Sequence, residues 1–220
     1  MAYITLQQVT KVYPGPEGGV SALTDVSLEI QQGDFAAILG PSGSGKSTLL
    51  TVLGAMSPPS RGRVEIDGRD LYREPSESLA DFRRRRIGFV FQQQHLIPYL
   101  TAVENVMLPL AVGRSERQLE RAMNALKEVG LDHRASHLPG QLSGGEQGRV
   151  AIARAIVNDP LLILADEPTG NLDAVSRESV LALLSSLNKE GRTIVMVTHS
   201  REAADAANRT IVLRDGRVVS

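Results

Sequence analysis

A glycine-rich octapeptide, residues 40–47, constrains the fold of this 220-residue chain more than any other feature of its sequence. It reads Gly-Pro-Ser-Gly-Ser-Gly-Lys-Ser and matches the pattern GxxxxGK(S/T), which requires a strand before it and a helix after it. Both are present in the sequence, because the apolar run 35–39 is typical of a buried strand and residues 48–53 continue as a helix. The sequence therefore predicts a strand, an anion-binding turn and a helix in direct succession.

The residue types of this turn suit a polyphosphate. Glycine adopts backbone φ values that other residues resist, so successive N–H groups can turn inward around an anionic oxygen. Lys46 adds a positive charge for the outer phosphates, and Ser47 offers a hydroxyl ligand to Mg²⁺ at the positive end of the helix dipole. We expect a Mg²⁺-nucleotide to be bound by Gly40, Pro41, Ser42, Gly43, Ser44, Gly45, Lys46, Ser47 and Thr48.

Charge and residue usage exclude several classes of protein. The 24 basic and 25 acidic residues give a net charge of −1, which argues against nucleic acid as a partner. The absence of cysteine excludes disulfides and thiolate catalysis and fits a reducing compartment. The longest apolar run, residues 106–112, includes a proline and is too short to span a membrane, and the first residues lack the pattern of a cleaved signal. We expect a chain that stays in the cytosol unless a partner holds it at a membrane.

The two ends of the chain carry the pattern of antiparallel strands. Residues 4–6 and 26–30 alternate polar and apolar side chains between glycine and proline breaks. The pairs Asp67-Gly68 and Asp215-Gly216 each follow such a run and predict tight hairpins. An antiparallel edge is expected.

Later segments alternate strand and helix. Apolar strand runs at 87–91, 161–165 and 193–198, the last two separated by a helical stretch at 174–188, predict a parallel sheet wrapped by helices. Between residues 94 and 160 no strand pattern appears.

That strand-free stretch reads as a helical insertion. Ser115 begins a capping-box pattern and Gly130 marks a helix end. The apolar residues between them fall on one helical face, and these are Leu119, Ala122, Met123, Leu126 and Val129. We expect one domain over residues 1–220, in which 1–92 and 161–220 form the core and β edge and 93–160 form the helical subdomain.

Asp166 and Glu167 follow the strand run 161–165, at the edge of the sheet where ligands of open α/β folds bind. Asp166 can hold Mg²⁺ through its water shell, and Glu167 can deprotonate a water aimed at the terminal phosphorus. His199 comes directly after the run 193–198 and can hydrogen-bond the outer phosphate or that water. A lone histidine is more often a surface residue, and its place at a strand end favours the functional interpretation.

Residues 142–146, Leu-Ser-Gly-Gly-Glu, follow the phosphate loop in sequence and precede the Asp-Glu strand. With these motifs the chain resembles, nearly from end to end, the ATP-binding subunits of ABC transporters. The resemblance implies an α/β fold: a RecA-like P-loop NTPase core with an antiparallel β edge and an inserted α-helical subdomain. It also implies ATP and Mg²⁺ as cofactors. The second anion site, which closes over ATP held by the opposite subunit, would consist of Ser143, Gly144, Gly145 and Glu146.

Further positions carry over from the same resemblance. Tyr13 resembles the aromatic that stacks on adenine, although a strand tyrosine is usually packing. Gln92 resembles the glutamine that reaches Mg²⁺ and the water, and Asp173 belongs to a loop that crosses the dimer interface. The implied catalytic residues are Glu167, His199, Gln92 and Lys46, and the implied metal ligands are Ser47, Gln92 and Asp166.

Residues 166–173, 87–92 and 96–106 are similar to the branch that serves lipoprotein release, macrolide-type export and cell division. Two positions depart from the family pattern, Gly148 in place of a glutamine and Ser200 in place of an aspartate. Gly148 should weaken its helix by about 1 kcal/mol without removing a catalytic group.

The resemblance implies a homodimeric ATPase at the cytoplasmic face of the inner membrane, which drives a separate transmembrane permease to export or extract a lipoprotein, lipid or drug-like substrate. The alternative is an ATP-dependent regulatory subunit of a cell-division-type complex that signals without transport. A small-molecule kinase has no use for the Ser143 loop. The four arginines at 83–86 invite a nucleic-acid interpretation, but they lack interleaved aromatics, and a solvated face or a patch toward the permease or lipid head groups fits them better.

Overall fold

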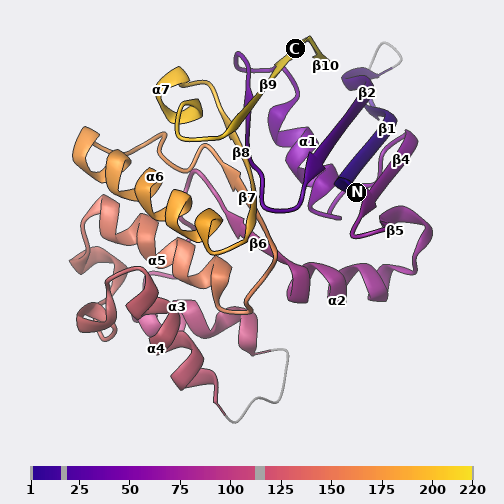
Figure 1. Ribbon diagram of the computed structural model, residues 1–220. Helices are drawn as coiled ribbons and strands as arrows, with labels where there is room; N and C mark the ends of the chain where they lie inside the picture. The colour runs from indigo at the N-terminus through magenta and orange to yellow at the C-terminus, as the bar shows by residue number, and fades with distance from the viewer. Residues whose placement is uncertain (1, 16–18, 112–116, 220) are drawn as a thin grey trace.

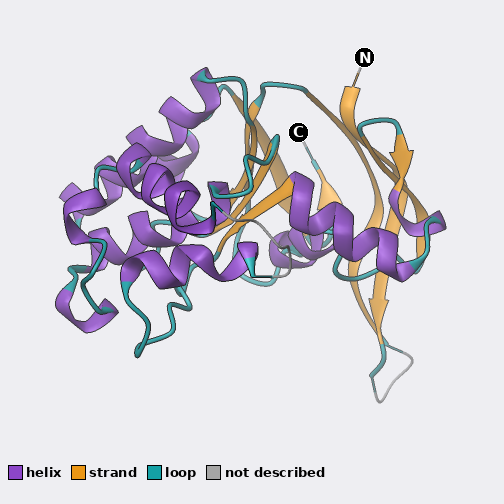
Figure 2. Cartoon of the chain, turned by 90° about the horizontal axis from the view of Figure 1, so that it is seen from below, coloured by secondary structure: helices purple, strands orange, loops and turns teal. Residues whose placement is uncertain are grey.

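The computed structural model describes residues 2–15, 19–111 and 117–219. Two sheets and a set of helices form its layers, and Figure 1 shows the helix α1 (Lys46–Leu53) between an antiparallel sheet and a second, larger sheet. Seen from below in Figure 2, most of the helices gather on one side of the molecule, and the long antiparallel strands lie on the other. The predicted capping box at Ser115 lies outside the described residues.

The smaller sheet is the antiparallel edge. Its strand order is β2-β1-β4-β5, from β1 (Ala2–Tyr13), β2 (Val20–Gln31), β4 (Arg61–Ile66) and β5 (Arg69–Asp70). β4 and β5 pair through the predicted hairpin, where Asp67 and Gly68 both have positive φ, 53° and 71°. Two residues with positive φ define the type I′ turn that matches strand twist, which explains the Asp-Gly pair.

The larger sheet has the order β10-β9-β3-β8-β7-β6. Four of its pairings are parallel, and only β10 runs antiparallel to its neighbour β9. The strands are β3 (Phe35–Leu39), β6 (Ile87–Val90), β7 (Leu162–Asp166), β8 (Thr193–Thr198), β9 (Arg209–Arg214) and β10 (Arg217–Val218). The parallel runs and the second Asp-Gly hairpin are confirmed, with strand ends displaced by one residue in β6 and β7.

Alternate residues of the parallel strands serve two separate cores. In β8, Ile194 and Met196 pack with the helices, whereas Val195 and Val197 pack with α1 and the antiparallel sheet. Because side chains alternate across a strand, a strand buried on both faces must be apolar throughout, and β8 is fully buried. The larger sheet is therefore the central layer of the molecule. The helices pack on one of its faces, and α1 with the antiparallel sheet packs on the other, so the ends of its strands are held in place.

The helical side holds α3 (Ala102–Met107), α4 (Gln118–Glu128), α5 (Gly144–Ile156) and α6 (Ala174–Lys189). Short 3₁₀ turns lie at Leu108–Leu110, Asp132–Arg134 and Pro139–Gln141. No strand lies in the described residues between 93 and 160. The fold class expected from the sequence, an α/β core with an antiparallel edge and a helical insertion, is confirmed.

The predicted apolar face of α4 is buried in its inner part and exposed at its start. Ala122 and Leu126 are fully buried, and Gly130 ends the helix with φ 73°. Leu119 lies in the first turn and is 59% exposed. Helical period determines which face a residue occupies, but only the neighbouring elements determine how far along the helix that face is covered.

The remaining helical elements are the 3₁₀ turn Leu71–Arg73, α2 (Ser76–Arg86) and α7 (Arg201–Ala204). The four arginines form the last turn of α2, where the helix dipole favours positive charge. Arg83 donates to the carbonyl of Ala55, and Arg84 and Arg85 both pair with Asp81. In the part of the chain that the structure describes, no helix is long and apolar enough to cross a membrane.

Candidate active site

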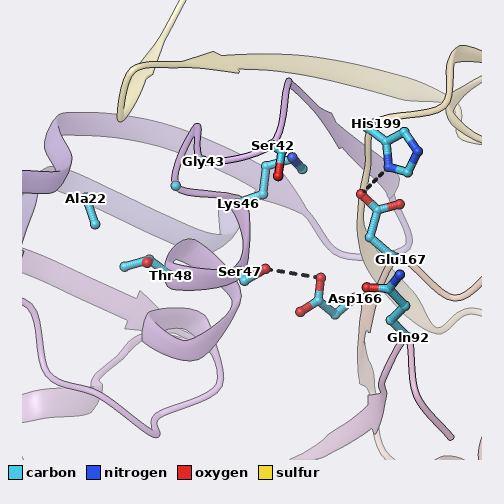
Figure 3. Close-up of a pocket in the computed structure, with 11 residues that line it drawn as sticks. Ala22, Ser42, Gly43, Lys46, Ser47, Thr48, Gln92, Asp166, Glu167 and His199 are labelled. Carbon is cyan, nitrogen blue, oxygen red and sulfur yellow. Dashed lines mark hydrogen bonds and ion pairs between the residues drawn. The ribbon is translucent and has the colours of Figure 1, made fainter. Parts of the chain in front are cut away.

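A cavity of about 300 Å³ lies where β3, β7 and β8 end, beside the N-terminus of α1. Figure 3 shows side chains from the phosphate loop facing carboxylates from the strand ends across this space. The residues that line it are Ala22, Ser42, Gly43, Gly45, Lys46, Ser47, Thr48, Gln92, Asp166, Glu167 and His199. Tertiary structure thus brings four separate predicted segments to one place: the phosphate loop, Gln92, the Asp166-Glu167 pair and His199.

The loop 40–47 needs glycine at two positions for different reasons. Gly45 has φ 100°, and a Cβ there would lie 2.3 Å from the carbonyl oxygen of Ala22. At Gly40 a Cβ would lie 2.2 Å from the carbonyl oxygen of Leu213. The loop is therefore packed against β2 and β9, and this contact leaves no room for a side chain. The hydroxyl of Ser44 is buried and has no hydrogen-bond partner among the described residues.

Lys46 lies inside this loop and is only 7% exposed. Its ammonium donates to the carbonyl oxygens of Gly40 and Pro41, both at 2.8 Å. An ammonium has three N–H donors, so two of them hold the head group within the loop. The positive charge is thereby fixed next to the inward-facing backbone rather than free in solvent.

The hydroxyl of Ser47 donates to Oδ1 of Asp166 at 3.3 Å, across the cavity from α1 to the end of β7 (Figure 3). Burial raises the pKa of Asp166, and the hydrogen bond from Ser47 partly offsets this effect. A partly buried carboxylate beside a hydroxyl is an oxygen pair that suits a hard divalent cation.

Glu167 and His199 meet at the ends of β7 and β8 (Figure 3). Nδ1 of His199 lies 2.8 Å from Oε1 of Glu167, and the hydroxyl of Thr198 donates to Oε2 at 3.3 Å. The Glu167 side chain is 13% exposed and that of His199 is 64% exposed. Glu167 also has φ 45°, a left-handed conformation that is uncommon for a residue with a side chain. Such strain at a strand end is typical of a position whose side-chain direction matters.

Gln92 follows β6 and lies at the cavity, with its amide beside Gly170. A Cβ added to Gly170 would lie 3.0 Å from Nε2 of Gln92. Gln92 is the one of three adjacent glutamines that was predicted from the sequence. Figure 3 shows its side chain beside Asp166 and Glu167.

The second predicted anion loop does not line this cavity. Ser143 caps α5, where its hydroxyl accepts from the N–H of Glu146 at 3.2 Å and the carboxylate of Glu146 accepts from the N–H of Ser143 at 2.8 Å. Glu146 is the third helical residue, so this is a complete capping box. These hydrogen bonds hold the pKa of Glu146 below its usual range, despite an opposing effect of burial.

Asp173 and Tyr13 also lie outside the cavity lining. Asp173 caps α6 by accepting from the N–H of Ser176 at 3.0 Å, which lowers its pKa. A Cβ at Gly145 would lie 2.5 Å from Oγ of Ser176, so the two loops pack together. Tyr13 is 39% exposed, and the ammonium of Lys11 lies 5.1 Å from its ring centroid.

Two features of the site were not predicted from the sequence. Ala22 belongs to β2 and lines the cavity, and Thr198 is the second hydrogen-bond partner of Glu167. Thr198 could have been found as the last residue of a strand, next to His199. Ala22 has no signal in its residue type, because only the packing of β2 against the loop places it there. Ser200, the residue that departs from the family pattern, accepts from the N–H of Ala203 and caps α7.

The family model described as ABC transporter matches residues 23–170. The uncharacterized ABC transporter ATP-binding protein YknY of Bacillus subtilis is 48% identical over 98% of this chain and 95% of that protein. The macrolide export ATP-binding/permease protein MacB of Chlorobium luteolum is 50% identical over 99% of this chain, which spans only 33% of that protein.

Among solved structures, one described as the dimeric post-hydrolysis state of the ATP-binding cassette MJ0796 bound to ADP and Pi has a TM-score of 0.90. It is 46% identical and covers 99% of this chain and 97% of its own. A family model over most of the chain, together with relatives of this identity over nearly its whole length, assigns the chain. It belongs to the ABC transporter family and is an ATP-binding domain of that family.

Proposed function

We propose that this chain is the ATP-hydrolysing subunit of an ABC transporter, that it works as a homodimer, and that it drives a separate membrane permease. One observation carries the proposal: Glu167, paired with His199, shares a cavity with Lys46 of the phosphate loop. A carboxylate held next to a phosphate loop is what hydrolysis of a terminal phosphate requires.

The phosphate chain of ATP fits the loop 40–47 on two grounds. The buried hydroxyl of Ser44 belongs to this loop and has no partner in the described protein, so an anionic oxygen bound at the loop would satisfy it. Lys46 keeps one N–H free of the loop carbonyls for the same anion. Thr48 lines the cavity and follows Ser47 in the first turn of α1. Tyr13 offers an exposed ring on which the adenine stacks.

Mg²⁺ would be held by Ser47 and Asp166, with Gln92 nearby. The described residues contain no cluster of three histidine or acidic side chains that would form an all-protein metal cage. This fits Mg²⁺, which usually keeps several waters and uses one or two protein oxygens together with substrate phosphates. When bound, the ion neutralises charge on the phosphate oxygens.

Glu167 acts as the general base. Its two oxygens accept from His199 and Thr198, which fixes the plane of the carboxylate and leaves lone pairs for one water. Glu167 takes the proton of that water as the water attacks the terminal phosphorus, and the bond from this phosphorus to the bridging oxygen breaks, so that ADP and inorganic phosphate are the products. His199 orients Glu167 through Nδ1 and has Nε2 available for the phosphate or the water. The positive charge of Lys46 stabilises the negative charge that develops on the outer phosphates during the reaction.

The homodimer explains why Ser143 and Asp173 lie away from this cavity. Both residues cap the start of a helix, where the first turn and the helix dipole favour an anion, so a second copy would bring these helix starts over the first copy's ATP. The MJ0796 structure, described as dimeric and bound to ADP and Pi, supports a dimer as the working form. The second anion loop of one protomer would then face the phosphate loop of its partner, which holds Lys46. The residues of that second loop are Ser143, Gly144, Gly145 and Glu146.

The permease would dock in a groove of about 900 Å³ between α2, β6 and α5. Its wall is mostly apolar and includes Met56, Phe89 and Phe91, with Arg84 and Asp81 also lining it. MacB-type relatives support a permease as occupant, because they carry ATP-binding and permease functions in one chain. The protein would then sit peripherally at the cytoplasmic face of the membrane, and the exported substrate would be a lipoprotein, a lipid or a drug-like molecule.

Glu167→Gln is the direct test. The variant should bind ATP as the unchanged protein does, hydrolyse it about 10²- to 10⁴-fold more slowly, and accumulate as a dimer with Mg²⁺-ATP. Steady-state phosphate release, nucleotide titration and size-exclusion chromatography measure these three quantities. Normal hydrolysis by Glu167→Gln would remove the base from the mechanism.

A further inference from the structure

We infer that Arg154 is a positioning residue that holds Gln92 in the geometry needed for hydrolysis, an inference that rests on the role proposed for Gln92. Arg154 lies in the last turn of α5. Its guanidinium donates through Nη1 to the carbonyl of His95 at 2.8 Å and through Nη2 to the carbonyl of Gln94 at 2.5 Å. The guanidinium of Arg154 thus binds the carbonyl groups of two consecutive residues just after Gln92. We call residues 92–95 the Gln92 segment.

The peptide that Arg154 grips has an unusual conformation. His95 has φ 48°, in the left-handed region that side-chain-bearing residues rarely occupy. A strained residue keeps such a conformation only where its surroundings impose it, and the contact from Arg154 to its carbonyl supplies that restraint. The ring of His95 also contacts Phe91 edge-on, with 5.6 Å between ring centroids. The chain on both sides of Gln92 is therefore held.

A second clamp anchors the far end of this segment. Asn105 of α3 is fully buried and accepts from the N–H of Ile97 at 2.7 Å. Its amide donates to the carbonyls of Ile97, Leu100 and Thr101 at 3.2, 2.9 and 3.0 Å. Asn105 fixes the chain from residue 97 onward to α3. The position of Gln92 therefore depends on the hydrogen bonds from Arg154, which are nearer to it. Only Gln93 separates Gln92 from the first carbonyl that Arg154 holds.

Arg154 also connects two other functional regions. It lines the groove proposed for the permease, together with Phe89 and His95. It belongs to the same rigid helix that begins at the Ser143 cap. Movement of α5, caused from either end, must therefore shift the peptide beside Gln92. Arg154 joins the groove, the Gln92 segment and the second anion loop.

A double-mutant cycle tests this inference. Steady-state hydrolysis of Mg²⁺-ATP is measured for the full chain with Arg154→Gln, with Gln92→Ala and with both changes. Each single variant should lower kcat about tenfold with KM for ATP changed by less than about twofold, and the double variant should be no slower than Gln92→Ala alone. If Arg154 had only a structural role, Arg154→Gln would lower kcat further in the double variant, below that of Gln92→Ala alone.

Arg121→Gln is the matched control. Arg121 makes the same kind of contact, from Nη2 to the carbonyl of Val157 at 2.9 Å, but it does not touch the Gln92 segment. Its loss should lower the thermal unfolding midpoint and leave kcat unchanged. Arg154→Lys, which keeps the charge but loses the fork, should recover part of the activity lost in Arg154→Gln. If Arg154→Gln does not fold, the same cycle is carried out with Arg154→Lys.

Three results would overturn the inference. Unchanged kcat in a folded Arg154 variant, or single effects that multiply in the double variant, would show that Arg154 does not act through Gln92. In both cases the proposed ATPase activity would stand, because Glu167→Gln reports on it separately. Full activity in Gln92→Ala would remove the role of Gln92 as well.

Discussion

Nδ1 of His199 lies 2.8 Å from Oε1 of Glu167, so the ends of two neighbouring parallel strands are joined by a histidine–carboxylate contact. The histidine is largely exposed and the carboxylate is largely buried. This arrangement orients the carboxylate from the solvent side while Thr198 holds it from the strand side.

His199→Ala should lower ATP turnover by about 10² to 10³, because Glu167 loses the partner that fixes its plane. Combined with Glu167→Gln, it should add little, since residues that act as a unit are not additive. Phosphate-release assays on the single and double variants measure this. His133→Ala, an exposed histidine in a 3₁₀ turn, is the control and should keep full turnover. Independent, multiplying effects would separate His199 from Glu167.

Asp166→Asn should raise the thermal unfolding midpoint near neutral pH when no nucleotide is present. Burial raises the pKa of Asp166 in the folded state, so its ionised form is destabilising above that folded pKa. The folded state binds the proton more tightly than the unfolded chain, so this penalty disappears as pH falls below the unfolded value near 3.8. Thermal melts of both proteins between pH 4 and pH 8 should converge at the acidic end. With Mg²⁺-ATP the order should reverse, because the variant loses a proposed metal ligand.

Gly148→Ala should stabilise the protein by about 1 kcal/mol, which corresponds to roughly 2–4 °C in the unfolding midpoint for a domain of this size. Gly148 is inside α5, and a Cβ there would meet only Val180 and Leu172 at 3.7 and 3.8 Å, ordinary contact distances. Gly145→Ala is the opposite case, because its Cβ would lie 2.5 Å from Oγ of Ser176. Differential scanning calorimetry should show a higher unfolding midpoint for Gly148→Ala and a lower one for Gly145→Ala.

Cysteines placed at Ser143 and Ser42 should crosslink between protomers in the presence of ATP, in a background that contains no native cysteine. The proposed dimer brings the Ser143 loop of one protomer over the phosphate loop of its partner. Mixing two singly substituted proteins, one carrying each cysteine, tests contact between chains directly. A crosslink that forms equally well without nucleotide, or fails with Mg²⁺-ATP, would contradict the head-to-tail arrangement.

Local chemistry made much of this protein predictable. The strand, turn and helix around residues 40–47 follow from glycine conformations and apolar runs, and both Asp-Gly hairpins follow from the positive φ that their turns require. These features depend on a few adjacent residues. Burial along α4 was predicted less well, because the exposure of Leu119 depends on which neighbours cover the helix.

The groups available for chemistry can be read from residue types and their order: a phosphate loop, carboxylates and a histidine at strand ends, and a second loop at a helix start. The folded arrangement selects which of them share a cavity, because parallel strands bring distant segments to one edge of the sheet. It joined Glu167 to His199 and Thr198, and Arg154 to the peptide beside Gln92. It also left Ser143 outside the cavity. Distances between residues far apart in the chain follow from packing, which no local pattern encodes.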